Sequence, residues 1–144
     1  MLGMHGTYEA NWAMHDCDLM LNIGARFDDR VTGRISGFSP KSEKIHIDID
    51  PSSVNKNVTV DLAIIGDATI ILEMLIAEMK AQSFVPHKAS LTKWWKQIEA
   101  WQNLDCLGFE QGADVIKPQH AIKRLCEMTR DRDTYVTTEV GQHQ

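Results

Sequence analysis

Charged side chains follow directly after an apolar segment near the start of the chain. The segment ends at Gly24, and four charged residues come just behind it: Arg26, Asp28, Asp29 and Arg30. Guanidinium groups bind phosphate in a forked geometry, and neighbouring carboxylates can hold them in orientation. The block therefore predicts an anion-binding loop. A cluster of surface ion pairs explains the same residues equally well, since such clusters are common and contribute little to stability.

Further polar residues stand near the ends of two later apolar segments. Asp48 occupies the kind of position from which an acidic residue accepts hydrogen bonds from ribose hydroxyls in dinucleotide-binding folds, although no Gly-x-Gly-x-x-Gly motif is present. Asp67 is expected to cap a helix first, and it could also face a nucleotide docked at that helix N-terminus. His46, Asp48 and Asp50 share one strand face and could hold a divalent metal, but polar alternation on a half-exposed strand explains them without one.

Two histidines lie near the ends of the sequence. His5 stands between Gly3 and Gly6, where the backbone can approach a ligand closely, although turn-forming glycines also explain this spacing. His143 lies beside Gln142, with no neighbouring serine or cysteine constellation in the sequence. The residue pattern alone assigns neither histidine to catalysis.

Short apolar segments that alternate with helical patterns predict a parallel α/β sheet whose ligands bind at the carboxyl ends of the strands. Strands are expected over residues 18–24, 44–50, 62–66 and 134–140. The first should be buried on both faces, and the second should place its isoleucines on one face. Helices are expected over residues 68–82, over 91–103 and from 118 onward.

The helical patterns also predict packing. An apolar stripe that includes Ile70, Ile71 and Met74 should hold the helix over 68–82 against the sheet. Ser90 is expected to cap the next helix, in which three tryptophans at helical spacing indicate a packing face rather than a cofactor platform. Residues 104–117 are expected to form a loop.

Composition limits the class of protein. The chain has 144 residues, 43% of them hydrophobic, with 15 basic and 20 acidic side chains, a formal charge of −5, and three widely spaced cysteines. One core can form without disulfides, and the cysteines fit a reducing compartment. The scattered basic residues argue against nucleic acid, and no apolar run approaches the ~20 residues that span a bilayer. We expect a cytoplasmic location, and the abrupt ends of the sequence suggest a piece of a larger protein.

Six sequence blocks resemble the catalytic subunits of the acetolactate synthase (acetohydroxyacid synthase) family and occur in the same order. They are Leu-Gly-Met-His-Gly-Thr at 2–7, Gly-Ala-Arg-Phe-Asp-Asp-Arg-Val-Thr-Gly at 24–33, His-Ile-Asp-Ile-Asp-Pro at 46–51, Gly-Asp at 66–67, Lys-Pro-Gln at 117–119 and Gly-Gln-His-Gln at 141–144. The resemblance covers the chain from end to end. The Arg-Phe-Asp-Asp-Arg-Val-Thr-Gly block is the most specific among thiamine-diphosphate decarboxylases.

This resemblance implies an α/β fold with a partial doubly wound, Rossmann-like parallel sheet, a helical linker, and the first helix and strand of a second α/β domain. Residues 1–82 would be the later part of a central FAD-binding domain, 83–114 a linker with an amphipathic helix, and 115–144 the start of the thiamine-diphosphate-binding domain. The flavin would be lined by Leu2, Gly3, Met4 and His5. Its ribityl and diphosphate region would meet Gly24, Ala25, Arg26, Phe27, Asp28, Asp29 and Arg30. The adenosine end would meet Asp48, Ile49, Ser53, Val54, Asp67 and Ala68.

By the same resemblance, Gln142 and His143 would contact thiamine diphosphate, whereas the magnesium ligands and the activating glutamate lie outside this chain. The implied reaction condenses two pyruvates, or pyruvate and 2-ketobutyrate, in branched-chain amino acid synthesis. The isolated chain is therefore expected to be inactive. The implied partners are 2-ketoacids, a second copy of the chain and a regulatory subunit, and a free sheet edge should favour self-association. The alternatives are a stand-alone flavin- or nucleotide-binding module, or another FAD-associated carboligase such as glyoxylate carboligase, which the Arg-Phe-Asp-Asp-Arg block disfavours.

Overall fold

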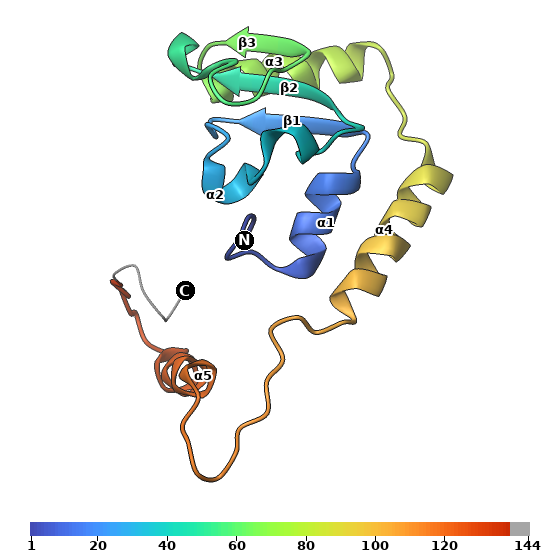
Figure 1. Cartoon of the computed structure of the whole chain (residues 1–144). Helices are drawn as coiled ribbons and strands as arrows, with labels where there is room; N and C mark the ends of the chain where they lie inside the picture. Colours follow the sequence, from blue (N-terminus) through green and yellow to red (C-terminus); the bar gives the residue numbers. More distant parts are fainter. Residues whose placement is uncertain (139–144) are drawn as a thin grey trace. The chain divides into compact units, whose positions relative to one another are not determined.

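The computed structural model describes residues 1–138 and divides the chain into two compact units, Met1–Cys106 and Leu107–Gln144 (Figure 1). The first unit holds a three-stranded sheet and most of the helices. The second unit contains α5. No helix among residues 1–138 has both the length and the apolar character needed to cross a membrane.

The sheet consists of three parallel strands in the order β1-β2-β3. They are β1 (Leu19–Ile23), β2 (Glu43–Asp48) and β3 (Leu62–Ile65). Leu21 is paired with Ile45, and Ile47 with Ile64, so the three arrows in Figure 1 point the same way. Each strand lies within two residues of its expected position, which confirms the parallel α/β prediction for this unit.

Helix boundaries follow local capping residues. In α1 (Tyr8–Asp16), the Thr7 hydroxyl accepts a hydrogen bond from the backbone of Ala10. This helix has no counterpart among the expected elements, because its short sequence mixes apolar and polar residues without a clear stripe. In α3 (Ala68–Ala81), the Asp67 carboxylate accepts from two backbone N–H groups of the first turn, as expected for an N-cap.

The expected helix over 91–103 begins earlier than predicted. In α4 (Lys88–Gln102), the cap is His87, whose ring nitrogen Nδ1 accepts from the Ser90 backbone. The prediction that Ser90 is the cap is therefore wrong. Trp101 stacks on Trp12 of α1 with ring centroids 6.3 Å apart, and Trp94 meets Trp101 edge-on at 5.8 Å. The predicted packing face is confirmed for these two tryptophans of α4 and is wrong for Trp95, which is 59% exposed.

The core of the first unit is small and lies around Phe27, Phe38 and Val58. The expectation that β1 is buried on both faces is wrong, because Leu19, Leu21 and Ile23 are exposed. A fully buried strand needs covering layers on both sides. Among the described residues, α3 packs against β2 and leaves this face of β1 open.

The face of α3 that meets the sheet also differs from the predicted stripe. Ile70 and Met74 are 59% and 67% exposed, whereas Ile71 and Leu72 are half-buried. A side chain of Ile71 lies under Gly66, at the start of the helix. The half-buried residues thus lie in the first turn of α3, next to Gly66, rather than along the whole predicted stripe.

In the second unit, residues 107–117 are irregular and α5 (Pro118–Thr129) begins at the proline, as expected. The rings of Phe109 and His120 meet edge-on, with their centroids 6.5 Å apart. The strand expected over 134–140 is not formed over 134–138, and 139–140 lie outside the described residues. A strand gains its hydrogen bonds from a neighbouring strand, and the described part of this unit contains none.

Candidate cofactor-binding site

Three loops begin at the same edge of the sheet, where the parallel strands end. The Gly24 N–H donates to the carbonyl of Ile47 at 2.9 Å, and the Gly66 N–H donates to the carbonyl of Asp48 at 2.9 Å. The chain segments that lead to Arg26 and Asp67 therefore start on either side of the end of β2. Parallel sheets bind ligands at this edge, so the fold brings the charged loops to a position suited to binding.

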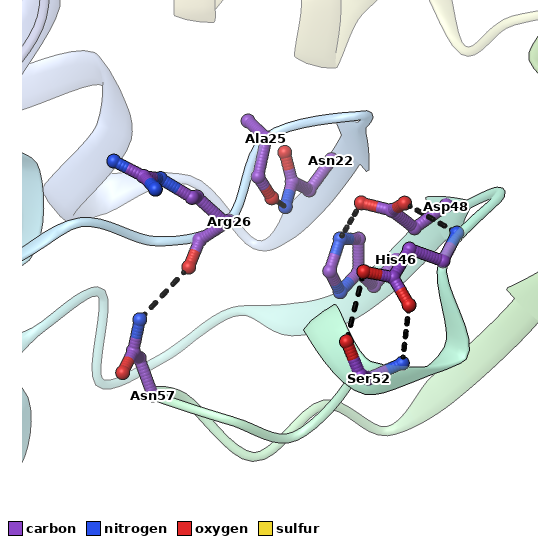
Figure 2. A network of polar contacts seen from close by, with 8 residues as sticks. Asn22, Ala25, Arg26, His46, Asp48, Ser52 and Asn57 are labelled. Atoms are coloured by element: carbon purple, nitrogen blue, oxygen red, sulfur yellow. Dashed lines mark hydrogen bonds and ion pairs between the residues drawn. The ribbon is translucent and has the colours of Figure 1, made fainter.

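The loop after β1 is held in place by its neighbours. Phe27 is buried, adopts a positive φ of 54°, and meets the His46 ring edge-on at 5.3 Å. The carboxamide of Asn22 donates to the Ala25 carbonyl, and that of Asn57 donates to the Arg26 carbonyl at 3.0 Å (Figure 2). The side chain of Phe27 packs in the core and holds the loop in place, whereas the side chains of Arg26 and Arg30 are exposed to solvent.

The arginines of this loop form exposed local ion pairs. Arg26 meets Asp28 at two points, Nη2–Oδ1 at 3.0 Å and Nε–Oδ2 at 3.2 Å. Arg30 meets Asp29 at 2.9 Å, and the arginine side chains are 73% and 71% exposed. Exposed pairs of this kind contribute roughly 0–1 kcal/mol. These pairs therefore contribute little to the stability of the fold, and the guanidinium groups remain accessible from outside.

The segment before α1 forms a turn against this loop. The Met4 N–H donates to the Arg30 carbonyl at 2.9 Å, and the Gly6 N–H donates to the Gly3 carbonyl at 2.9 Å. Gly3 is buried with φ +85°, and a Cβ added there would lie 2.2 Å from the Arg30 carbonyl oxygen. Only glycine fits this contact. The side chains of Leu2, Met4 and His5 remain exposed.

Two cavities lie beside the turn and the loop. One of about 730 Å³ is lined by Leu2, by residues 24–28 and by β1. The other, of about 600 Å³, is lined by Gly3, Met4 and Arg30 among others. Both volumes fall within the roughly 300–1,000 Å³ typical of small-molecule sites. Backbone, apolar surface and exposed guanidinium groups together suit a phosphate-bearing ligand such as a dinucleotide.

The polar face of β2 differs from the expected half-exposed surface. The His46 side chain is 0% exposed, and its Nε2 lies 3.4 Å from Asp48 Oδ2. No hydrogen-bond partner of Nδ1 or Nε2 is found among the described residues. Asp48 is 10% exposed, and its Oδ1 accepts from the Asp50 N–H at 2.9 Å. Phe27, whose ring meets His46 edge-on, lies against this face of β2, the central strand of the sheet.

Beyond β2, the two oxygens of Asp50 accept from Ser52, from its N–H at 2.9 Å and from its hydroxyl at 2.8 Å. The backbone N–H of Ser52, followed by its hydroxyl, lowers the pKa of Asp50 below its usual value. Ser52 therefore holds both carboxylate oxygens of Asp50. Within residues 1–138 no group of three or more histidine, cysteine or acidic side chains is placed to hold a metal, so the metal alternative for His46, Asp48 and Asp50 is not supported.

The remaining expected contacts of the adenosine end lie along the same edge of the sheet. Ile49 is exposed, whereas Ser53, Val54 and Ala68 are half-buried. The Asp67 carboxylate Oδ1 caps α3. Gln142 and His143 lie outside the described residues.

Three asparagines position the loops, and no sequence pattern singles them out. Asn22 and Asn57 hold the loop after β1, and Asn11 holds the turn before α1. Asn22 could have been noticed in the sequence, because it is the polar residue within the apolar segment that forms β1. Asn11 and Asn57 bond to residues that only the fold brings near them.

Comparison with known proteins gives the class to which this fold belongs. The family model described as "Thiamine pyrophosphate enzyme, central domain" matches residues 1–75. The chain therefore belongs to the thiamine pyrophosphate enzyme family, through its central domain.

Among curated relatives, the whole chain is 44% identical to the acetolactate synthase large subunit of Buchnera aphidicola subsp. Schlechtendalia chinensis. It is also 44% identical to the acetolactate synthase isozyme 3 large subunit of Escherichia coli (strain K12), and 40% identical to the acetolactate synthase large subunit of Porphyra purpurea. All 144 residues are covered, and the chain spans about a quarter (24–25%) of the length of these relatives. The resemblance seen in the sequence blocks is thus confirmed.

Proposed function

We propose that this chain is part of a thiamine-diphosphate-dependent acetolactate synthase, which joins two pyruvates, or pyruvate and 2-ketobutyrate, into acetohydroxyacids. The observation that carries the proposal is the 44% identity to acetolactate synthase large subunits over every residue of the chain. The chain alone is expected to be inactive. The thiamine group supplies the electron sink for such a condensation, and the protein supplies orientation and electrostatics.

We propose that residues 1–82 form the later part of a domain that binds FAD, with 83–114 as a linker and 115–144 as the start of the thiamine-diphosphate domain. Arg26 and Arg30 would bind the diphosphate, because their guanidinium groups are exposed beside the two cavities. Asp28 and Asp29 would keep them oriented. The other proposed contacts at the flavin and diphosphate are Leu2, Gly3, Met4, His5, Gly24, Ala25 and Phe27, the last through its backbone.

At the adenosine end, the proposed contacts are Asp48, Ile49, Ser53, Val54, Asp67 and Ala68. Two of them have partners within the chain already. Asp48 meets His46 and the Asp50 N–H, and Asp67 caps α3. A carboxylate oxygen has more than one lone pair, so each can still accept a ribose hydroxyl. Gln142 and His143 are proposed to contact thiamine diphosphate, with magnesium bound by residues of the parent enzyme outside this chain.

The proposed partners are 2-ketoacid substrates, a second copy of the chain and a regulatory subunit, in a cytoplasmic enzyme. Support for self-association comes from the edge of β1 opposite β2, which has no strand beside it among the described residues. Free strand edges pair readily with other chains. Light scattering of the purified chain tests this point, and a monodisperse monomer would contradict it.

A chimera tests the enzymatic proposal directly. The matching quarter of the E. coli isozyme 3 large subunit is replaced by these 144 residues, and acetolactate formation from pyruvate is measured. We expect the chimera to retain bound flavin and to form acetolactate, while the isolated chain forms none. A folded chimera that binds flavin without turnover would favour the stand-alone binding module over the enzyme. Turnover by the isolated chain would refute its expected inactivity.

A further inference from the structure

The carboxamide of Asn11 holds both backbone groups of one residue in the turn before α1. The Gly3 N–H donates to Asn11 Oδ1 at 2.7 Å, and Asn11 Nδ2 donates to the Gly3 carbonyl at 2.8 Å. These bonds are half-buried and join residues eight positions apart. The side chain of Asn11, which belongs to α1, thus satisfies both the N–H and the carbonyl of Gly3, as a neighbouring strand would.

The turn cannot move without disturbing its contact with α2 (Asp29–Thr32). Met4 donates to the Arg30 carbonyl, and Gly3 packs so closely on that carbonyl that no Cβ would fit. Asn11 and the Arg30 carbonyl therefore both bond to the turn. Figure 1 shows the N-terminus of the chain close to α1. The cavity of about 600 Å³ is lined by all four of these residues, Gly3, Met4, Asn11 and Arg30.

We propose that Asn11 is a positioning residue for flavin binding, acting through Gly3 and Met4. The inference rests on the proposed FAD site and adds a residue to it. Asn11 keeps the turn against α2, so that the exposed Met4 and His5 side chains and the Arg30 carbonyl stand in one fixed arrangement. Without the carboxamide, the hydrogen bonds of the turn to the rest of residues 1–138 are reduced to the one with the Arg30 carbonyl, beside the bonds inside the turn. A mobile turn must then be ordered when the ligand binds, which weakens binding.

The test uses the 144-residue chain with FAD as the probe. Asn11→Ala removes both bonds, and Asn103→Ala is the matched control, since no hydrogen bond of the Asn103 side chain is found among the described residues. Amide hydrogen exchange of Gly3 and Met4 is followed by NMR, FAD affinity by flavin fluorescence, and helix content by circular dichroism. We expect Asn11→Ala to speed exchange of both amides and to weaken FAD binding, each about tenfold or more, whereas Asn103→Ala changes neither.

A second variant keeps the test decisive if Asn11→Ala does not fold. Asn11→Asp retains the acceptor for the Gly3 N–H and places a charged oxygen against the Gly3 carbonyl, so FAD affinity should again fall about tenfold. Unchanged FAD affinity in a folded Asn11 variant would overturn the inference and leave the FAD site standing. If the unaltered chain binds no FAD, the proposed flavin site fails, and the role of Asn11 fails with it. The exchange rates of the ligand-free chain distinguish a loosened turn from a site that was never present.

Discussion

Replacement of His46 by alanine should strongly destabilise the first unit. The ring is 0% exposed and meets Phe27 edge-on at 5.3 Å. The polar contact of the ring with Asp48 is weaker than this packing, because the distance from Nε2 to Asp48 Oδ2 is 3.4 Å, longer than that of a good hydrogen bond. Truncation of a large buried side chain costs about 3–5 kcal/mol for phenylalanine, and the smaller imidazole should lose about 2–4 kcal/mol. About 0.5–1.5 kcal/mol of this is the aromatic pair.

His46→Leu separates packing from the polar contact. If packing dominates, leucine fills most of the space and the free energy of unfolding falls by less than about 1.5 kcal/mol. Urea unfolding followed by circular dichroism gives the free energies, with the exposed His5→Ala as the control expected within about 0.5 kcal/mol of the unaltered chain. The reasoning is refuted if His46→Leu is as unstable as His46→Ala. A double-mutant cycle with Asp48→Asn would then assign the loss to the polar pair.

Four further changes give distinct signatures. Arg26→Ala should weaken FAD binding about tenfold in a fluorescence titration while urea stability changes by less than about 1 kcal/mol; a loss of stability with unchanged affinity would mark Arg26 as structural. Gly3→Ala should lower the free energy of unfolding by about 1–3 kcal/mol, because a Cβ would collide with a backbone carbonyl of α2, and an unchanged melting temperature would disprove the close contact. Ser52→Ala should raise the pKa of Asp50 toward its usual value in an NMR titration, because the hydroxyl bond is lost. A lowered pKa stabilises the fold above the ordinary pKa, and that stability is lost as pH falls through the folded pKa, so the free energy of unfolding of the variant should depend less on pH in the acid range. An unmoved pKa would contradict the assignment. Asp67→Ala should cost about 1 kcal/mol through the lost cap, whereas no change in helix stability would show the cap to be dispensable.

Local patterns were enough for the elements whose signals lie within a few residues. The alternation around Ile45 and Ile47 predicted β2, the acidic cap predicted the start of α3, and Pro118 predicted the start of α5. The order of the sequence blocks predicted the family, because a block such as Arg-Phe-Asp-Asp-Arg is specific irrespective of how it folds. The parallel arrangement also followed, since strands separated by crossovers pair in this way.

Other features depended on contacts between distant parts of the chain. His46 was expected on a half-exposed face, and it is buried in contact with Phe27, which lies nineteen positions earlier in the chain. The asparagine of the turn, Asn11, carried no pattern that distinguished it from any polar helix residue, and its role arises only when Gly3 is placed beside it. The expected stripe on α3 did not show which way the helix is turned.

By itself, the amino-acid sequence determined the family, the parallel strands, the capping of α3 and the charged loop behind β1, because each rests on residue types and short spacings. Only the tertiary structure decided that His46 is buried, that β1 is open on one face, and that three asparagine carboxamides hold the loops. The physical reason is that burial and hydrogen-bond partners are set by whichever segments pack together, and no local pattern contains that information.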